Sequence, residues 1–311
     1  MSRVPKGRSA VTGTSLSPGV DLAQVSAAAP GAGGSVLSAV LRRLGSSVVV
    51  VVLALVVLAL LWVVLLRVFH VSPFVGKTPS DVLHYLFTAH PRPGVRPTSL
   101  TVGEARAALG GAWLVTLGDA CIGSLTGMLV ALAVASAFVL FKPLEFAFMP
   151  IAMLLRSVPL VAIAPVLLLI LGQGKLGIAS IGAIVVLFPA LVNAVLGLRS
   201  ASPMALDLVR VNGGSEAAAL RLVRLPAALP NLFASVRISV PGAIVGAMLA
   251  EWLSGFTGLG GILSTYKGSG NFGGVWSIVV VSVITSIVGY AIASVVESAV
   301  LAAWGPDAGK S

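Results

Sequence analysis

Five ionisable residues interrupt the long apolar stretches of this chain, and their side chains define the chemistry open to it: Asp119, Arg156, Arg237, Glu251 and Glu297. A charged side chain that faces lipid costs about 3 kcal/mol or more, so each of these needs a partner or a task. The Arg156 guanidinium is suited to a planar oxyanion, which makes contact with an anionic solute one interpretation. A structural pairing of Arg156 with a carbonyl or an acid stays equally open.

Glu251 stands shortly before the glycine-rich run Gly258–Gly261, which could pack closely or bend. The pair suggests a gate, and a structural contact between helices is the alternative for Glu251. Arg237 and Glu297 stand near the ends of their apolar runs, where a long side chain can reach the interface, so we expect both to be structural. The role of Asp119 stays open.

Enzyme motifs do not occur in the sequence. A phosphate-binding P-loop needs a glycine five positions before a Gly-Lys pair. The three Gly-Lys pairs have Val71, Leu169 and Trp304 at that position. His84 and His90 have no thiol or carboxylate companions in a metal-binding pattern. We therefore predict no catalytic, cofactor-binding or metal-binding residues, and any energy for uphill transport must come from another subunit or an ion gradient.

Composition predicts an integral membrane protein, because 57% of the residues are hydrophobic and only 10% are charged. A spanning helix needs about 20 apolar residues. Six runs meet this need approximately: Ser47–Val68, Ala112–Phe141, Phe146–Leu171, Leu176–Leu198, Leu229–Ser254 and Val275–Trp304. The sequence thus predicts an all-α protein with six transmembrane helices.

Prolines divide the third run, at Pro150, Pro159 and Pro165. A spanning helix tolerates proline where neighbours or water satisfy the carbonyls that proline leaves unpaired. A break beside a transport pathway and a simple packing kink are both consistent with this pattern. Pro159, Pro165 and Asn193 of the next run are therefore candidates for the pathway, together with Arg156 and Glu251.

Basic residues predict the orientation in the membrane. They cluster in the N-terminal tail and in the loop around Asp207, which six spans place on one side, so we expect both termini and that loop in the cytoplasm. The segment between the first two spans also has basic residues, and these weaken the prediction: Lys77, Arg92, Arg96 and Arg106. Basic residues that flank spans are explained by topology and lipid headgroups, so no nucleic-acid partner is expected.

Smaller features concern packing and local structure. Thr78, Pro79 and Asp81 have the order of a helix N-terminus, with Thr78 as the cap. The single cysteine, Cys121, is expected to be a small buried residue. Two GxxxG patterns, at Gly123 and Gly242, predict close helix packing.

A polar segment between two apolar runs predicts a projecting element. Helical residues 204–211 lead into Gly213-Gly214, and a second helical segment, 215–223, is expected to stop at Leu225-Pro226. Two short helices bent around glycine would form a compact knob suited to contact with another protein. Its spacing is Asp207, five residues, Gly213, nine residues, Val223, one residue, then Leu225-Pro226.

This spacing resembles the cytoplasmic EAA loop of the permease subunits of bacterial ATP-binding-cassette importers, with Asp207-Leu208-Val209 at the Glu-Ala-Ala position. The segments 154–174, 187–198, 225–239 and 250–263 are similar to the nitrate, sulfonate and taurine branch of that family. The resemblance implies a type I importer permease fold in the bacterial inner membrane. It also implies that the coupling loop, at about 200–228, contacts an ATPase through Asp207, Gly213, Gly214, Ser215, Val223, Leu225 and Pro226.

The partners implied are cytoplasmic ATPase subunits, an extracytoplasmic solute-binding protein and a second permease subunit, most simply an identical one. The implied substrate is a small oxyanion such as an aliphatic sulfonate, taurine or nitrate, with a thiamine-pyrimidine precursor or another small organic as the alternative. An ion-coupled secondary transporter is a more distant alternative. We expect three regions: a disordered cytoplasmic tail (1–45), the permease domain (46–305) and a C-terminal tail (306–311).

Overall fold

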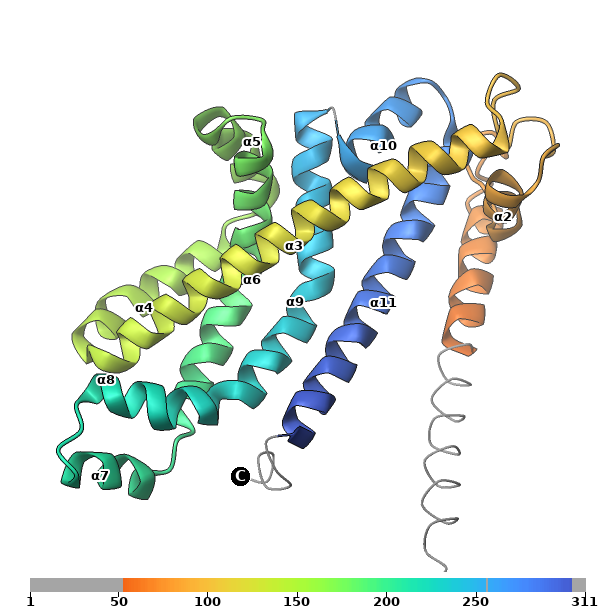
Figure 1. The fold of residues 1–311 in the computed structure, drawn as a ribbon. Helices are drawn as coiled ribbons and strands as arrows, with labels where there is room; N and C mark the ends of the chain where they lie inside the picture. The colour runs from red at the N-terminus through yellow and green to blue at the C-terminus, as the bar shows by residue number, and fades with distance from the viewer. Residues whose placement is uncertain (1–52, 256, 304–311) are drawn as a thin grey trace, which may run out of the picture. The chain divides into compact units, whose positions relative to one another are not determined.

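A computed structural model describes residues 53–255 and 257–303 (Figure 1). Both expected tails, 1–45 and 306–311, lie outside the described residues. The chain divides into two units, the first ending at Leu61, and the second, from Trp62 onward, holds all the elements discussed below. Its helices are α2 (Pro79–Phe87), α3 (Val102–Leu140), α4 (Lys142–Ser157), α5 (Leu160–Leu171), α6 (Lys175–Arg199), α7 (Pro203–Val211), α8 (Glu216–Ala219), the π-turn η2 (Leu220–Arg224), α9 (Leu225–Ser254), α10 (Gly258–Gly268) and α11 (Phe272–Ala303).

Four of the described helices are long and apolar enough to cross a membrane: Val102–Leu140, Lys175–Arg199, Glu216–Ser254 and Phe272–Ala302. Two shorter apolar helices, Leu53–Val68 and Leu160–Leu171, lie within the first and third predicted spans. The all-α membrane architecture is confirmed, and each of the six predicted runs contains an apolar helix. The start of the first predicted span, residues 47–52, lies outside the described residues.

The third predicted span is not one helix. α4 ends at Ser157, and α5 begins at Leu160 after the extended residue Pro159. Proline disfavours a helical conformation in the residue before it and has no N–H to donate, so the chain turns at Val158-Pro159. Pro150 and Pro165, by contrast, lie inside α4 and α5. The prediction of a broken third span is confirmed, and its break lies at Pro159.

Three helices, α3, α6 and α9, form the packed centre of the bundle, and their buried residues are mostly alanine with valine, leucine and isoleucine. Both GxxxG patterns contact α6. A β-carbon at Gly123 would lie 3.0 Å from the Gly182 Cα, and one at Gly246 would lie 3.2 Å from the same atom. Gly182 therefore lies where α3 and α9 both approach α6 closely, as small residues allow in membrane helices.

The two ends of α9 carry different structures (Figure 1). α7 and α8 precede its N-terminus, and we call this the loop end. α10 follows its C-terminus and packs with α2 and the first turns of α3 around Tyr85, Leu259 and Ile278, and we call this the cap end. The predicted helix start at Thr78 is confirmed, because Thr78 and Asp81 form a reciprocal capping box with Pro79 at the first helical position.

Basic residues at the cap end are bound to backbone carbonyls. The buried Arg96 donates to the carbonyls of Tyr85, Thr88, Ala89 and Leu100 at 2.8–3.1 Å. Lys77 donates to the Pro73 carbonyl at 2.6 Å, and burial lowers the pKa of Lys77. Arg106 donates to the Leu86 carbonyl at 2.6 Å. These residues have local structural tasks, so they count less against the predicted orientation than their number suggests.

Candidate docking loop and pathway residues

The turn after α7 is built around Gly213. The Gly213 N–H donates to the Arg210 carbonyl at 2.9 Å, and the Gly214 N–H donates to the Val209 carbonyl at 2.8 Å. These two bonds, with φ +76° at Gly213, make a Schellman motif, which ends a helix with a left-handed residue. A β-carbon at Gly213 would meet nothing within 4 Å, so backbone conformation, not space, requires glycine there. Gly214 is limited by space, since a β-carbon there would collide with Val209.

Arg210 holds the two arms of the loop together. Its guanidinium donates to Glu216 at 2.9 Å across the glycine turn and to Asp207 at 3.3 Å one turn back. The hydrogen bond to Glu216 and the charges of both acids raise the pKa of Arg210. Ser215 caps α8, because its hydroxyl accepts from the Ala218 N–H at 3.2 Å. The turn geometry and the ion pairs give the loop a defined shape although all of it is polar surface.

α7 has two apolar faces. One face is packed: Leu206 is buried against Ala201 and Ala219, with Val223 at the edge of this cluster. The other face is exposed at positions spaced four and three apart, where Met204 is 82%, Leu208 65% and Val211 86% exposed. Residues with this spacing lie along one side of a helix. We call Met204, Leu208 and Val211 the α7 stripe.

The second arm of the loop does not stop at Leu225-Pro226, and the prediction that it does is wrong. α8, η2 and α9 form one continuous helical run, Glu216–Ser254. The π-turn over Leu220–Arg224 widens the helix, and the Leu225 N–H donates back to the Leu220 carbonyl. Pro226, in the first turn of α9, follows this widened turn, where a missing N–H does not break a regular ladder. The arm therefore continues directly into the membrane helix.

At the cap end, Glu251 is fully buried and holds the start of α10. Its Oε2 accepts from the Gly260 N–H at 2.9 Å and from the Thr116 hydroxyl at 2.8 Å. The Thr116 oxygen in turn accepts from the Leu259 N–H at 2.8 Å. Thr257, the N-cap residue of α10, makes no side-chain capping bond, so Glu251 and Thr116 take over that task from other helices. A β-carbon at Gly258 would collide with the Glu251 carboxylate.

The family model described as the inner membrane component of binding-protein-dependent transport systems matches residues 123–301, which include the docking loop, Glu251 and α10. The chain belongs to this family. It is 33% identical over 198 residues to a probable ABC transporter permease protein of Haemophilus influenzae, a match that covers 63% of this chain and 77% of the relative. The chain is therefore an integral membrane permease with the type I permease fold, as the sequence predicted.

Relatives whose names carry a substrate match shorter parts of the permease. A riboflavin transport system permease of Chloroflexus aurantiacus is 32% identical over 125 residues, 40% of this chain and 47% of the relative. A formylaminopyrimidine transport permease of Halalkalibacterium halodurans is 29% identical over 116 residues, 37% of this chain and 46% of the relative. A putative aliphatic sulfonates transport permease of Bacillus subtilis is 27% identical over 146 residues, 47% of this chain and 53% of the relative. In these three matches the permease spans about half the length of each relative.

The structure does not gather the five candidate pathway residues into one site. Pro159 and Pro165 are exposed on α5. Asn193 is half-buried and donates to the Pro189 carbonyl of its own helix at 2.9 Å. Arg156 lies near the end of α4. Glu251 is closed off in the hydrogen bonds described above, which favours the interhelical contact that was the alternative to a gate.

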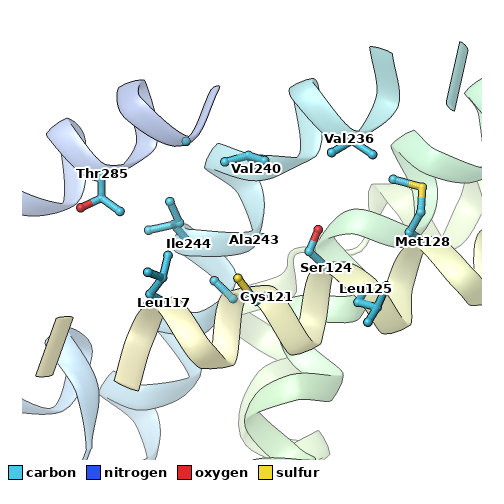
Figure 2. Close-up of a pocket in the computed structure, with 12 residues that line it drawn as sticks. Leu117, Cys121, Ser124, Leu125, Met128, Val236, Val240, Ala243, Ile244 and Thr285 are labelled. Carbon is cyan, nitrogen blue, oxygen red and sulfur yellow. The ribbon is translucent and has the colours of Figure 1, made fainter. Parts of the chain in front are cut away.

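An apolar groove of about 400 Å³ runs between α3, α9 and α11 (Figure 2). Leu117, Leu125 and Met128 of α3 face Val240 and Ile244 of α9 across it. The expectation that Cys121 is buried is wrong, because Cys121 lines this groove and is exposed. The groove has few polar atoms to offer an anion, so it does not suit the expected oxyanion substrate.

Sequence reasoning missed three residues with clear structural tasks. Glu216 was set aside as a copy of the Glu-Ala-Ala motif in the wrong register, yet it pairs with Arg210. Arg210 itself could have been found from its spacing of three after Asp207, which places both on one helix face. Thr116 had no sequence signal, because its partners lie 135 and 143 residues away.

Proposed function

We propose that the permease forms the membrane pathway of an ATP-driven importer and that the α7 stripe docks onto an ATPase subunit. The supporting observation is the exposed row Met204, Leu208 and Val211 on a helix whose other face is anchored by Leu206. Exposed apolar rows of this kind are energetically unfavourable in water and mark contact surfaces for other proteins. Asp207, Gly213, Gly214, Ser215, Val223, Leu225 and Pro226 shape the element that presents the stripe.

In this proposal the ATPase hydrolyses ATP and the permease does not. Closure of two ATPases on ATP binding moves the docking loops, the pathway opens outward, and a solute-binding protein delivers its ligand. Hydrolysis returns the pathway to the inward-open state. One bundle of this kind does not enclose a pathway by itself, so the permease acts as a pair, most simply of identical chains. The region 46–305 is the permease domain, with the loop and both termini in the cytoplasm of a bacterial cell.

The substrate is a small solute. The sulfonate relative supports an oxyanion such as an aliphatic sulfonate, taurine or nitrate. The riboflavin and formylaminopyrimidine relatives support a second candidate, a small heterocyclic organic. Competition uptake assays with an unlabelled sulfonate and an unlabelled pyrimidine, each against labelled solute in the same cells, separate these two classes.

Purification of the tagged chain from its native membrane, followed by mass spectrometry of the proteins that come with it, tests the docking role. Wild type and Leu208→Met, which keeps an apolar side chain, are expected to retain a P-loop ATPase. Leu208→Glu places a charge in the apolar contact and is expected to reduce the bound ATPase at least tenfold, a loss of about 1.4 kcal/mol or more. Membrane insertion of the variant is checked by its yield and its elution profile.

Two results contradict the proposal. If the wild-type chain is well folded and brings no ATPase, an ion-coupled carrier becomes the better description. If Leu208→Glu retains as much ATPase as Leu208→Met, the stripe is not the docking surface.

A further inference from the structure

A second cavity, of about 500 Å³, lies near the cap end between α3 and the start of α6. Its wall on α3 is mostly apolar, with Leu114, Val115 and Ile122. Its polar side chains are Asp119 of α3, Gln173 and Lys175 at the start of α6, and Thr257 before α10. Cavities of this size hold small ligands, and an apolar wall with a few polar groups is the usual composition of such sites.

Asp119 is the unusual residue of this cavity. It is only 4% exposed, and no side chain or backbone group of the described residues makes a hydrogen bond or an ion pair with it. Buried carboxylates in proteins normally have partners, and an acid inside a membrane span is costly and marks a functional site. The part of Asp119 that is not covered by protein faces this cavity.

Lys175 supplies the opposite charge on the other side of the cavity. Its charge is felt at Asp119, yet among the described residues the two side chains form no ion pair. Lys175 is also the first residue of α6, whose N-cap, Gly174, provides no side-chain cap. The N–H groups at the start of this 25-residue helix therefore add to the positive potential beside Lys175.

We propose that this cavity is a solute subsite for a small zwitterion, with the ammonium group bound by Asp119 and the acidic group bound by Lys175 and the start of α6. The apolar wall of α3 accommodates a short alkyl linker between the two charged groups. This inference rests on the proposed function, because it narrows the transported solute to molecules that carry both charges.

The charges disfavour the two simpler ligands. A purely anionic solute would meet the unneutralised carboxylate of Asp119, and the negative charge of Glu251 also acts there. A purely cationic solute would meet Lys175 and the helix N-terminus. A zwitterion neutralises both ends, and charge-assisted hydrogen bonds of this kind are about twice as strong as neutral ones.

The test compares two probes that differ in one group. Taurine carries an ammonium and a sulfonate, and isethionate has a hydroxyl in place of the ammonium. Saturation-transfer NMR measures binding of each to the complete complex in lipid nanodiscs, which mass spectrometry shows to be without solute-binding protein. The wild-type complex is expected to bind taurine at least tenfold more tightly than isethionate.

Asp119→Asn, which keeps the size of the side chain, is expected to weaken taurine binding at least tenfold and to remove the preference over isethionate. Glu104→Gln removes an exposed acid from the same helix and serves as the matched control, with binding equal to wild type. The comparison of the two probes on wild type needs no variant, so it decides even if Asp119→Asn does not fold.

The subsite is refuted if wild type binds the two probes equally, binds neither, or if Asp119→Asn binds taurine as wild type does. The ATPase content of the same preparations reports on the proposed function separately. A complex that retains its ATPase and shows no preference for taurine rejects the subsite alone. A chain without an ATPase rejects the proposed function, whatever it binds.

Discussion

At the scale of single residues, the cap end depends on polar groups that are buried and shared. Thr116 donates to Glu251 and accepts from the Leu259 N–H, so one hydroxyl connects α3, α9 and α10. A buried N–H or carboxylate that loses its partner costs about 1–3 kcal/mol. The contribution of Thr116 is therefore larger than that of an isolated hydroxyl.

We expect Thr116→Val, which keeps the shape of the side chain and removes the hydroxyl, to destabilise the folded protein by about 2 kcal/mol or more. Thr116→Ser keeps the hydroxyl and should remain close to wild type. Thermal unfolding in detergent, followed by the loss of helical signal, measures both. A Thr116→Val variant as stable as Thr116→Ser would show that the shared hydroxyl does not hold α10 in place.

A second pair of charged residues joins α9 to α11. The Arg237 guanidinium lies 3.0 Å from the Glu297 carboxylate and 5.7 Å from the centre of the Tyr290 ring. Both acid and base were expected to be structural, and the ion pair between them supports that interpretation. Removal of one partner leaves the other charge in a poorly solvated position.

Arg237→Met and Glu297→Leu should each destabilise the protein by roughly 1–3 kcal/mol, because each leaves one charge without its partner. The double variant has no such charge and should lose less than the sum of the two single variants. Unfolding in increasing denaturing detergent gives the four stabilities of this cycle. Strict additivity would mean that the two side chains do not interact in the membrane.

At the scale of elements, the docking loop is a rigid turn between helices. The Schellman motif at Gly213 and the clamp of Arg210 on Glu216 fix the angle between α7 and α8. The α7 stripe is useful for docking only if α7 is held at a constant angle to the helix that continues into the membrane. The left-handed residue at the turn therefore has a direct effect on coupling.

Gly213→Val should uncouple transport, since a β-branched residue strains φ +76° by about 1–2 kcal/mol and shifts the turn. Gly213→Asn should retain most activity, because asparagine tolerates the left-handed conformation. ATP-dependent uptake into vesicles, normalised to the amount of inserted chain, compares the two. Equal uptake would show that the turn conformation does not matter for coupling.

The elements also show where sequence reasoning succeeds and where it stops. The break at Pro159 and the cap at Thr78 follow from local chemistry, namely a missing N–H and a side-chain oxygen at the right position. The spacing around Gly213 indicated the turn for the same reason. The π-turn that carries α8 into α9 was not predicted, because proline after leucine usually ends a helix and only the packed structure shows that the ladder has already widened.

At the scale of the whole molecule, one continuous helical run joins the two functional ends. The run Glu216–Ser254 begins at the docking loop and ends three residues after Glu251, which holds α10. A helix of this kind moves as a rigid body over most of its length. Displacement of the loop by an ATPase would therefore reach the cap end through α9, with the π-turn as the place where bending is easiest.

The groups at the cap end are far apart in sequence, which explains why the pathway residues were poorly predicted. Asp119, Lys175 and Thr257 come from three different parts of the chain and share a cavity only after α3, α6 and α10 have packed. Membrane spans can be read from composition, since each depends on its own residues. A solute site depends on which spans become neighbours, and a single sequence does not encode that in any local pattern.

The exposed position of Cys121 in the groove between α3, α9 and α11 makes the protein its own reporter. Because the chain contains one cysteine, a nitroxide or fluorophore attached to this thiol would label a single, known place without any prior cysteine removal. The label would lie where helices from the centre of the bundle meet α11 (Figure 2). Its mobility in the presence and absence of ATP would follow the opening and closing of the helices in the unmodified sequence.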